Sequence, residues 1–306
     1  MKKLAILLNL LIIPVLSFAG FVHTFDFLNI PESGINEIAS TSGLATYNGI
    51  ASVFGNPAGF AEANSRGIIL SDTENIGDTR KLSVFYGAPA RYFNFIAGVK
   101  YFYMKDSIQY NNSDLDYNSY SVNLLLARIL PFAKKLNFGL NIDYTGSSLA
   151  DSSSSLLLFH TGFLYHLGLP VIAGLKDKNN VGLGVGLRNL GFSLQSYNKD
   201  ETVPLTVNTG LKYRFINFNK FATSFYVNYS YNTVGEQYPA FSMVFDLFRM
   251  LSLSAAYKMN DSVNPLSMGV GVDLSYQKLS YGFYYSIMPV SDFSFVHTIS
   301  LVIGRK

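Results

Sequence analysis

The feature that most constrains the fold is an alternation of apolar and polar side chains over stretches of about ten residues. From Leu205 to Phe215, the odd positions are apolar except for Thr209, and the even positions are polar, charged or glycine. Successive side chains of a strand point to opposite faces, so this stretch predicts a strand with one apolar and one polar face. Lipid on one side and a polar lumen on the other is the environment of a strand in a transmembrane β-barrel.

The same alternation recurs along the chain after residue 65. We predict an all-β, antiparallel transmembrane barrel of about fourteen strands, because an even number is usual for bacterial barrels. Twelve strands is the alternative, since the first two runs and the region 239–258 alternate weakly. The predicted runs are 66–71, 80–88, 92–104, 118–130, 135–146, 156–167, 180–190, 204–215, 220–232, 239–247, 250–258, 266–276, 278–287 and 295–303.

Composition separates a barrel from a soluble β-sandwich, which would also alternate. Charged residues are 14 % of the chain, against roughly 25 % in soluble domains, and hydrophobic residues reach 49 %. The polar faces of the runs contain mostly Gly, Ser and Asn, which suits an enclosed lumen better than a water-exposed face. Tyr and Phe at strand ends, such as Tyr101, Tyr213 and Tyr276, suit the aromatic girdles of a membrane wall.

The first 19 residues have the pattern of a cleavable signal peptide. Lys2 and Lys3 precede an apolar run that ends in Ser17–Ala19, where small residues occupy the cleavage-site positions. A transmembrane anchor is the alternative, but the apolar run is short for a bilayer span. Without Lys2 and Lys3 the chain keeps 21 basic and 20 acidic residues, so no large basic field argues for nucleic acid. Export and the barrel pattern together predict a bacterial outer-membrane location.

Residues 20–65 do not show the alternation of apolar and polar residues that marks the predicted strands. Asn56 and Pro57 suit the N-cap and the first position of a short helix. We expect this segment, called the hatch below, to fold into the lumen of a barrel formed by residues 66–306. The alternative geometry is a periplasmic cap beneath the barrel.

The run ASVFGNPAGFAEA, residues 51–63, resembles the NPAG signature of the PorV/PorQ-like family, and the wider FadL-like fatty-acid transporter superfamily has a related signature. The segments GLGVGLRNLG, VPLTVNTGLKYRF and FVHTISLVIG also resemble strands of PorV-type proteins. The resemblance implies a fourteen-stranded barrel with an N-terminal hatch and marks Asn56, Pro57, Ala58 and Gly59 as the plug motif. This chain departs from the pattern in its shorter loops and in its end at Lys306 without a terminal aromatic residue.

Ionisable residues on the polar strand faces are the candidate functional residues. Whether a residue has the odd or the even position in its strand, called its parity below, decides which face it lies on. Parity predicts that nine of these residues point into the lumen, where they either satisfy one another and the hatch or form a polar track for a solute. The six that we select for the track are Lys100, Asp143, Arg188, Lys212, Arg214 and Asp273; the other three are His160, His166 and Asp246.

Catalysis and cofactors have little support in the sequence. His160 and His166 are six residues apart, roughly 20 Å along a strand, so they cannot hold one metal ion. Gly182, Gly184 and Gly186 lack the spacing of a nucleotide-binding loop, and a small strand face that leaves room for the hatch is the better interpretation. We expect no enzyme activity and no cofactor.

Three functions remain open at the level of sequence. The first is a FadL-like passive conduit for small hydrophobic or amphipathic molecules. The second is a PorV-like anchor or shuttle for a secreted protein partner, and the third is a chiefly structural role. Outer-membrane lipid is an expected partner of each, and nucleic acid of none.

Overall fold

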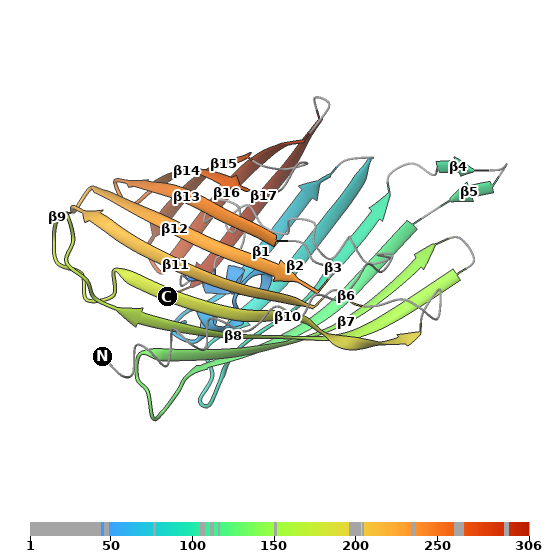
Figure 1. The fold of residues 1–306 in the computed structure, drawn as a ribbon, viewed down its shortest axis with the longest axis horizontal. Coiled ribbons are helices and arrows are strands. Elements are labelled where there is room, and N and C mark those ends of the chain that lie inside the picture. Colours follow the sequence, from blue (N-terminus) through green and yellow to red (C-terminus); the bar gives the residue numbers. More distant parts are fainter. Residues whose placement is uncertain are drawn as a thin grey trace.

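The computed structural model describes residues 44–45, 49–75, 78–104, 108–110, 113–115, 117–149, 152–195, 203, 205–233, 237–259, 266–290 and 294–305. Its main feature is one closed antiparallel barrel of fourteen strands (Figure 1). The strands of the wall are β1 (Arg66–Glu74), β2 (Thr79–Ala88), β3 (Asn94–Met104), β6 (Tyr117–Ile129), β7 (Leu136–Leu149), β8 (Ser152–Leu167), β10 (Val181–Gln195), β11 (Thr206–Asn217), β12 (Phe221–Asn232), β13 (Gln237–Leu247), β14 (Leu251–Lys258), β15 (Leu266–Tyr276), β16 (Leu279–Val290) and β17 (Ser294–Arg305).

Each wall strand pairs with its neighbour in the chain, and β1 pairs with β17 to close the ring. Three short strands lie outside this pattern: β9 (Ala173–Gly174) pairs in parallel with β11, and β4 (Ile108–Tyr110) forms a hairpin with β5 (Ser113–Leu115). In the described part of the chain, no helix is long and apolar enough to cross a membrane. The prediction of fourteen strands is confirmed, including the two weakly alternating regions.

Several predicted runs are shorter than the strands that the structure shows. The predicted runs 135–146 and 156–167 leave the polar tract Ser147–Ser155 between two strands, but Ser147 lies in β7 and Ser152–Ser155 begin β8. Hydrophobic alternation cannot mark such ends, because hydroxyl side chains there satisfy one another instead of facing lipid. Ser147 and Ser154 share a hydrogen bond of 2.9 Å across the two strands.

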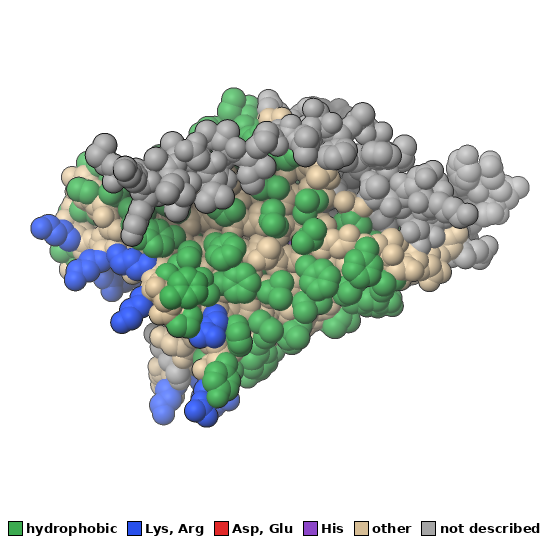
Figure 2. Space-filling model, turned by 60° about the horizontal axis from the view of Figure 1, so that its bottom comes forward, with side chains coloured by type: hydrophobic (Ala, Val, Ile, Leu, Met, Phe, Trp, Pro, Cys, Tyr) green, Lys and Arg blue, Asp and Glu red, His purple; other side chains and the backbone are tan. Residues whose placement is uncertain are grey.

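The two faces of the wall follow the parity of the sequence. The outward face exposes large apolar side chains, and Figure 2 shows them as a broad band along the wall. Examples from around the ring are Val84, Val99, Val122, Leu124, Val185, Phe241, Leu253, Phe283 and Ile299. The inward face is polar or small, with Ser71, Ser121, Asn141, Asn208, Ser242 and Ser300 all buried. This is the arrangement that lipid outside and an enclosed lumen inside require.

The described part of the hatch, residues 44–45 and 49–65, packs against the inner face of the barrel. It contains two 3-10 helices, η2 (Gly49–Phe54) and η3 (Pro57–Phe60), drawn in blue in Figure 1. Asn56 caps η3 and Pro57 is at its first turn, so the predicted cap is confirmed. The expected signal peptide, residues 1–19, lies outside the described residues.

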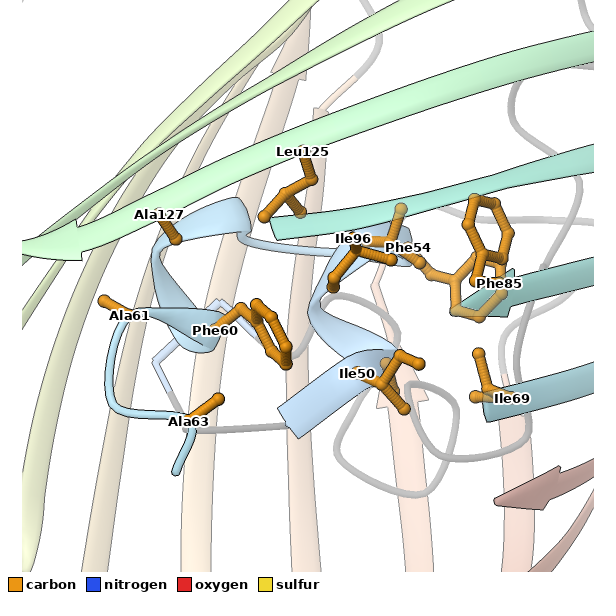
Figure 3. Close-up of a cluster of buried hydrophobic side chains, with 12 residues drawn as sticks. Ile50, Phe54, Phe60, Ala61, Ala63, Ile69, Phe85, Ile96, Leu125 and Ala127 are labelled. Atoms are coloured by element: carbon orange, nitrogen blue, oxygen red, sulfur yellow. The ribbon is translucent and has the colours of Figure 1, made fainter. Parts of the chain in front are cut away.

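An apolar cluster joins the hatch to β1, β2, β3 and β6. Figure 3 shows the side chains of η2 and η3 directed at inward residues of those strands. Phe54 meets Phe85 of β2 edge to face, with 5.2 Å between ring centroids. The cluster consists of Ile50, Ala51, Val53, Phe54, Phe60, Ala61 and Ala63 from the hatch and Ile69, Phe85, Ile96, Leu125 and Ala127 from the wall. Here the lumen contains a packed core instead of polar side chains.

Candidate functional site in the lumen beside the hatch

Asn56 attaches the hatch to β8. Its side-chain amide donates to the carbonyl of Phe163 at 3.0 Å and to that of Leu44 at 2.7 Å. Its side-chain oxygen accepts from the N–H of Ala58 at 3.0 Å. The residue is 1 % exposed, so these three bonds satisfy an amide that has no access to water.

Glycines of the inner wall let the backbone of the hatch come into direct contact with the strands. A Cβ atom at Gly139 would lie 2.2 Å from the carbonyl carbon of Pro57, and one at Gly162 would lie 2.0 Å from Oδ1 of Asn56. At Gly182 and Gly184 the same atom would lie 2.0 Å from the carbonyl oxygens of Ala45 and Leu44. Only glycine fits at these positions, because any side chain would overlap the hatch.

Asn94 holds the other end of the described hatch segment. The two N–H groups of its amide are shared among the carbonyl oxygens of Phe60, Ala61 and Ala63, which lie 3.1, 3.0 and 2.9 Å from the nitrogen. Asn94 begins β3 and has inward parity, so a search for inward amides could have found it. Glu62 extends from the same segment and accepts a 2.9 Å hydrogen bond from Asn137 of β7.

A buried charge cluster lies in the lumen next to η2 and η3. Nζ of Lys100 is 3.6 Å from Oδ2 of Asp143, and Nε2 of His160 is 3.9 Å from the same oxygen. Thr145 donates to the other carboxylate oxygen at 2.9 Å and shares a 2.7 Å hydrogen bond with Ser121. The side chain of Asp143 is 3 % exposed and that of Lys100 is 10 % exposed, so the pair is shielded from water.

A β-bulge in β10 adjoins this cluster. The register with β8 shifts between Leu187 and Leu190, and Asn189 has a left-handed φ of 60°. The N–H of Asn189 donates to Nδ1 of His160 at 3.1 Å, which ties the bulge to the charge cluster. Arg188 of the bulge lines a small cavity together with Lys100, Asn141 and His160 of the wall and Val53, Gly55 and Pro57 of the hatch.

The sequence contains a signal for this bulge that parity counting passed over. Apolar residues occupy odd positions at Leu183, Val185 and Leu187, then even positions at Leu190, Phe192 and Leu194. The change of phase at the polar pair Arg188–Asn189 marks one extra residue in the strand. Asn is also one of the residues that best tolerate a left-handed backbone.

The six residues predicted for a polar track do not form one continuous line. Lys100, Asp143 and Arg188 lie together beside the hatch, whereas the other three have other partners. Lys212 lies over the ring of Tyr226, with 5.6 Å from Nζ to the centroid. Arg214 pairs with Asp177 at 3.2 Å, and Asp273 accepts a hydrogen bond from Tyr284.

The remaining three inward candidates also have local partners. Nε2 of His166 lies 3.5 Å from a carboxylate oxygen of Glu62 in the hatch, and Asp246 accepts from Ser252 at 2.8 Å. His160 joins Lys100 and Asp143 in the charge cluster. Among the described residues, no three His, Asp or Glu side chains are grouped closely enough to hold a metal ion.

Comparison with known proteins gives the fold a context. No family model matches the chain, and no curated protein matches its sequence. Among solved structures, the barrel resembles the deltaS2S3 mutant of the TodX monoaromatic hydrocarbon channel, with a TM-score of 0.59 at 12 % identity, covering 92 % of this chain and 99 % of that one. TodX itself is described as a Pseudomonas putida toluene transporter.

Two further structures have a similar fold. The CymD monoaromatic hydrocarbon channel has a TM-score of 0.57 at 11 % identity, covering 92 % of this chain and 98 % of that one. A Pseudomonas aeruginosa FadL homologue has a TM-score of 0.55 at 11 % identity, covering 90 % and 98 %. The fold is therefore that of the FadL-type barrels, and nothing in these comparisons singles out the PorV/PorQ-like family.

Proposed function

We propose that this protein is an outer-membrane conduit through which small hydrophobic or amphipathic molecules pass when the hatch moves. The observation that carries the proposal is the way the hatch is held. Backbone contacts on glycine, two clusters of hydrogen bonds and one apolar cluster hold it, and all of these can separate and re-form. The similarity to hydrocarbon channels supports the same class of solute.

The bulge in β10 offers a place where a solute could leave the lumen sideways. β11 pairs with β10 only from Val181 to Arg188. Beyond Arg188, β10 continues to Gln195, and no described strand pairs with its free edge. Leu190, Phe192 and Leu194 on this stretch are each at least 50 % exposed, so a hydrophobic molecule leaving there would meet an apolar surface.

The charge cluster gives this conduit an amphipathic interior. Lys100, Asp143 and His160 border the hatch from β3, β7 and β8, while the apolar cluster around Phe54 and Phe85 packs it against β1, β2, β3 and β6. A molecule with a polar head and an apolar tail could therefore contact matching surfaces as the hatch moves. A protein anchor or shuttle would need no such interior, and nothing in the described lumen favours that alternative.

We expect that fixing the hatch to the wall abolishes passage. The chain has no cysteine, so an Ala61→Cys, Ala127→Cys variant can be joined by a short reversible thiol crosslinker without side reactions. Both positions belong to the apolar cluster between η3 and β6 (Figure 3). Uptake of labelled toluene or oleate by cells that express the crosslinked barrel should fall to background, and a reducing agent should restore it.

The single-cysteine variants treated with the same reagent are the controls. They should transport as the unmodified protein does, because neither can join the hatch to the wall. Uptake that continues at the full rate with the hatch crosslinked would overturn the proposal, and so would a barrel that passes neither probe before crosslinking.

A further inference from the structure

One end of the barrel, where β1 begins and β17 ends, has a ring of exposed basic side chains. Each of the turns that join wall strands at this end contributes at least one of them. Figure 2 shows Lys and Arg gathered at the end of the apolar band where these turns lie. We call this ring the basic rim; it consists of Arg66, Arg91, Lys134, Lys135, Lys176, Lys178, Lys220, Arg249, Lys278 and Arg305.

The charges of the basic rim are not neutralised by the barrel itself. None of the ten forms an ion pair with any residue that the structure describes. The described acidic residues near this end have other partners: Asp177 pairs with Arg214, and Glu62 lies beside His166 and Asn137. Asp246 accepts a hydrogen bond from Ser252, and Asp273 accepts one from Tyr284. The rim therefore presents nearly uncompensated positive charge.

The sequence makes the opposite end acidic. The segments that join the strands there, by their place in the chain, include only Lys105 and Lys199 as basic residues. Their acidic residues are Asp78, Asp106, Asp114, Asp116, Asp151, Asp200, Glu201, Glu236, Asp261 and Asp292. Because the net charge of the whole chain is only +3, this separation of signs places the positive charge at one particular membrane boundary.

Large apolar side chains alternate with the basic ones along the rim. Tyr92, Phe132, Ile172, Phe218 and Phe248 are between 50 % and 84 % exposed, and each lies within a few residues of a rim Lys or Arg. The guanidinium of Arg91 lies over the ring of Tyr92, 5.3 Å from its centroid. Aromatic bodies beside cationic heads are typical of the interface between lipid tails and headgroups.

We propose that the basic rim binds the phosphates of anionic phospholipid headgroups in the adjoining leaflet. The cations form a ring with one or two in each turn, and such a ring matches a surface that surrounds the barrel. A protein partner would contact a patch on one side, whereas lipid headgroups can meet the cations of every turn. Single-phosphate headgroups suit positive charge that is distributed over all the turns, and the proposal holds whether or not a solute passes the hatch.

Native mass spectrometry of the barrel in mild detergent tests the proposal. The protein is mixed with equal amounts of phosphatidylglycerol and phosphatidylcholine that have the same acyl chains, and the retained lipids are counted. The test variant replaces Lys134, Lys176, Lys178, Lys220 and Lys278 with Gln, and the matched control replaces the same five residues with Arg. Each cation near an anionic surface adds roughly fivefold to the affinity, so the Gln variant should lose at least about tenfold in its preference for phosphatidylglycerol.

The control with five Arg should keep the preference of the unmodified protein, since the charge is unchanged. Added salt should weaken the preference of both, because it screens exposed charges. Absence of any preference in the unmodified protein, or an undiminished one in the Gln variant, would overturn the proposal. So would a preference for a bis-phosphorylated glycolipid over phosphatidylglycerol in an equal mixture. If the variant with five Gln substitutions fails to fold, Lys220→Gln with Lys278→Gln provides the same comparison with a smaller expected loss of preference.

Discussion

Replacing Gly162 with alanine is expected to displace the hatch while the barrel stays folded. The new Cβ atom would lie 2.0 Å from Oδ1 of Asn56 and 2.9 Å from its Cγ. Asn56 cannot turn aside without breaking its bonds to Leu44, Phe163 and Ala58. Overpacking of this kind costs about 1–3 kcal/mol, and that cost falls on the contact between the hatch and β8.

The neighbouring strand offers a matched control. Gly186 of β10 lies opposite Gly162 of β8 in the strand register, and it too belongs to the inward face of the wall. A Cβ atom there would find its nearest neighbours at 3.4 and 3.5 Å, which is ordinary contact. Gly186→Ala should therefore change the stability by no more than about 0.5 kcal/mol.

A single cysteine in the hatch reports its position. Ser52 of η2 is 1 % exposed, and Ser52→Cys introduces the only thiol of the chain. We expect a maleimide reagent to modify this cysteine much faster in the Gly162→Ala background than in the Gly186→Ala background. Circular dichroism should show the same β-rich spectrum in both. Equal reaction rates in the two backgrounds would contradict the proposed contact between Asn56 and β8.

The difference between Gly162 and Gly186 shows what a sequence can and cannot reveal about this fold. The wall was predictable because alternation is local: a strand facing lipid must repeat every two residues wherever it lies in the chain. The cap at Asn56 and Pro57 was predictable for the same reason, since both residues act on their own neighbours. Which inward glycine contacts the hatch depends on the closed barrel, where Asn56 meets Phe163 across 107 positions of sequence.

The same distinction between local pattern and tertiary contact applies to the candidate site. Parity placed Lys100, Asp143 and Arg188 on inward faces, but only the register between strands could reveal that they meet beside the two hatch helices. Arg214 also has inward parity, yet it pairs with Asp177 of a turn, which periodicity does not describe. The bulge at Asn189 is the intermediate case. It leaves a change of phase in the sequence, while its bond to His160 comes from tertiary structure.

Neutralising one member of the Lys100–Asp143 pair should destabilise the barrel far more than removing both. Asp143→Asn leaves the ammonium of Lys100 in a site where its side chain is only 10 % exposed, without the carboxylate 3.6 Å away. Removing one partner of a buried ion pair costs about 3–5 kcal/mol, because the remaining charge keeps its desolvation penalty. Replacing both with uncharged residues of similar size is often nearly neutral, so Asp143→Asn with Lys100→Met should recover most of the loss.

A double-mutant cycle on the free energy of unfolding in detergent measures this coupling, and the barrel contains its own reference pair. Arg80 and Asp72 bond on the outward face, with side chains 39 % and 34 % exposed. An exposed pair contributes only about 0.2–1 kcal/mol, so Arg80→Met with Asp72→Asn should show little coupling. Similar coupling energies for the two pairs would mean that the lumen around Lys100 is open to water. A large difference would mean that the hatch keeps this part of the lumen dry, because an ion pair beside an open channel would be screened as the outer pair is.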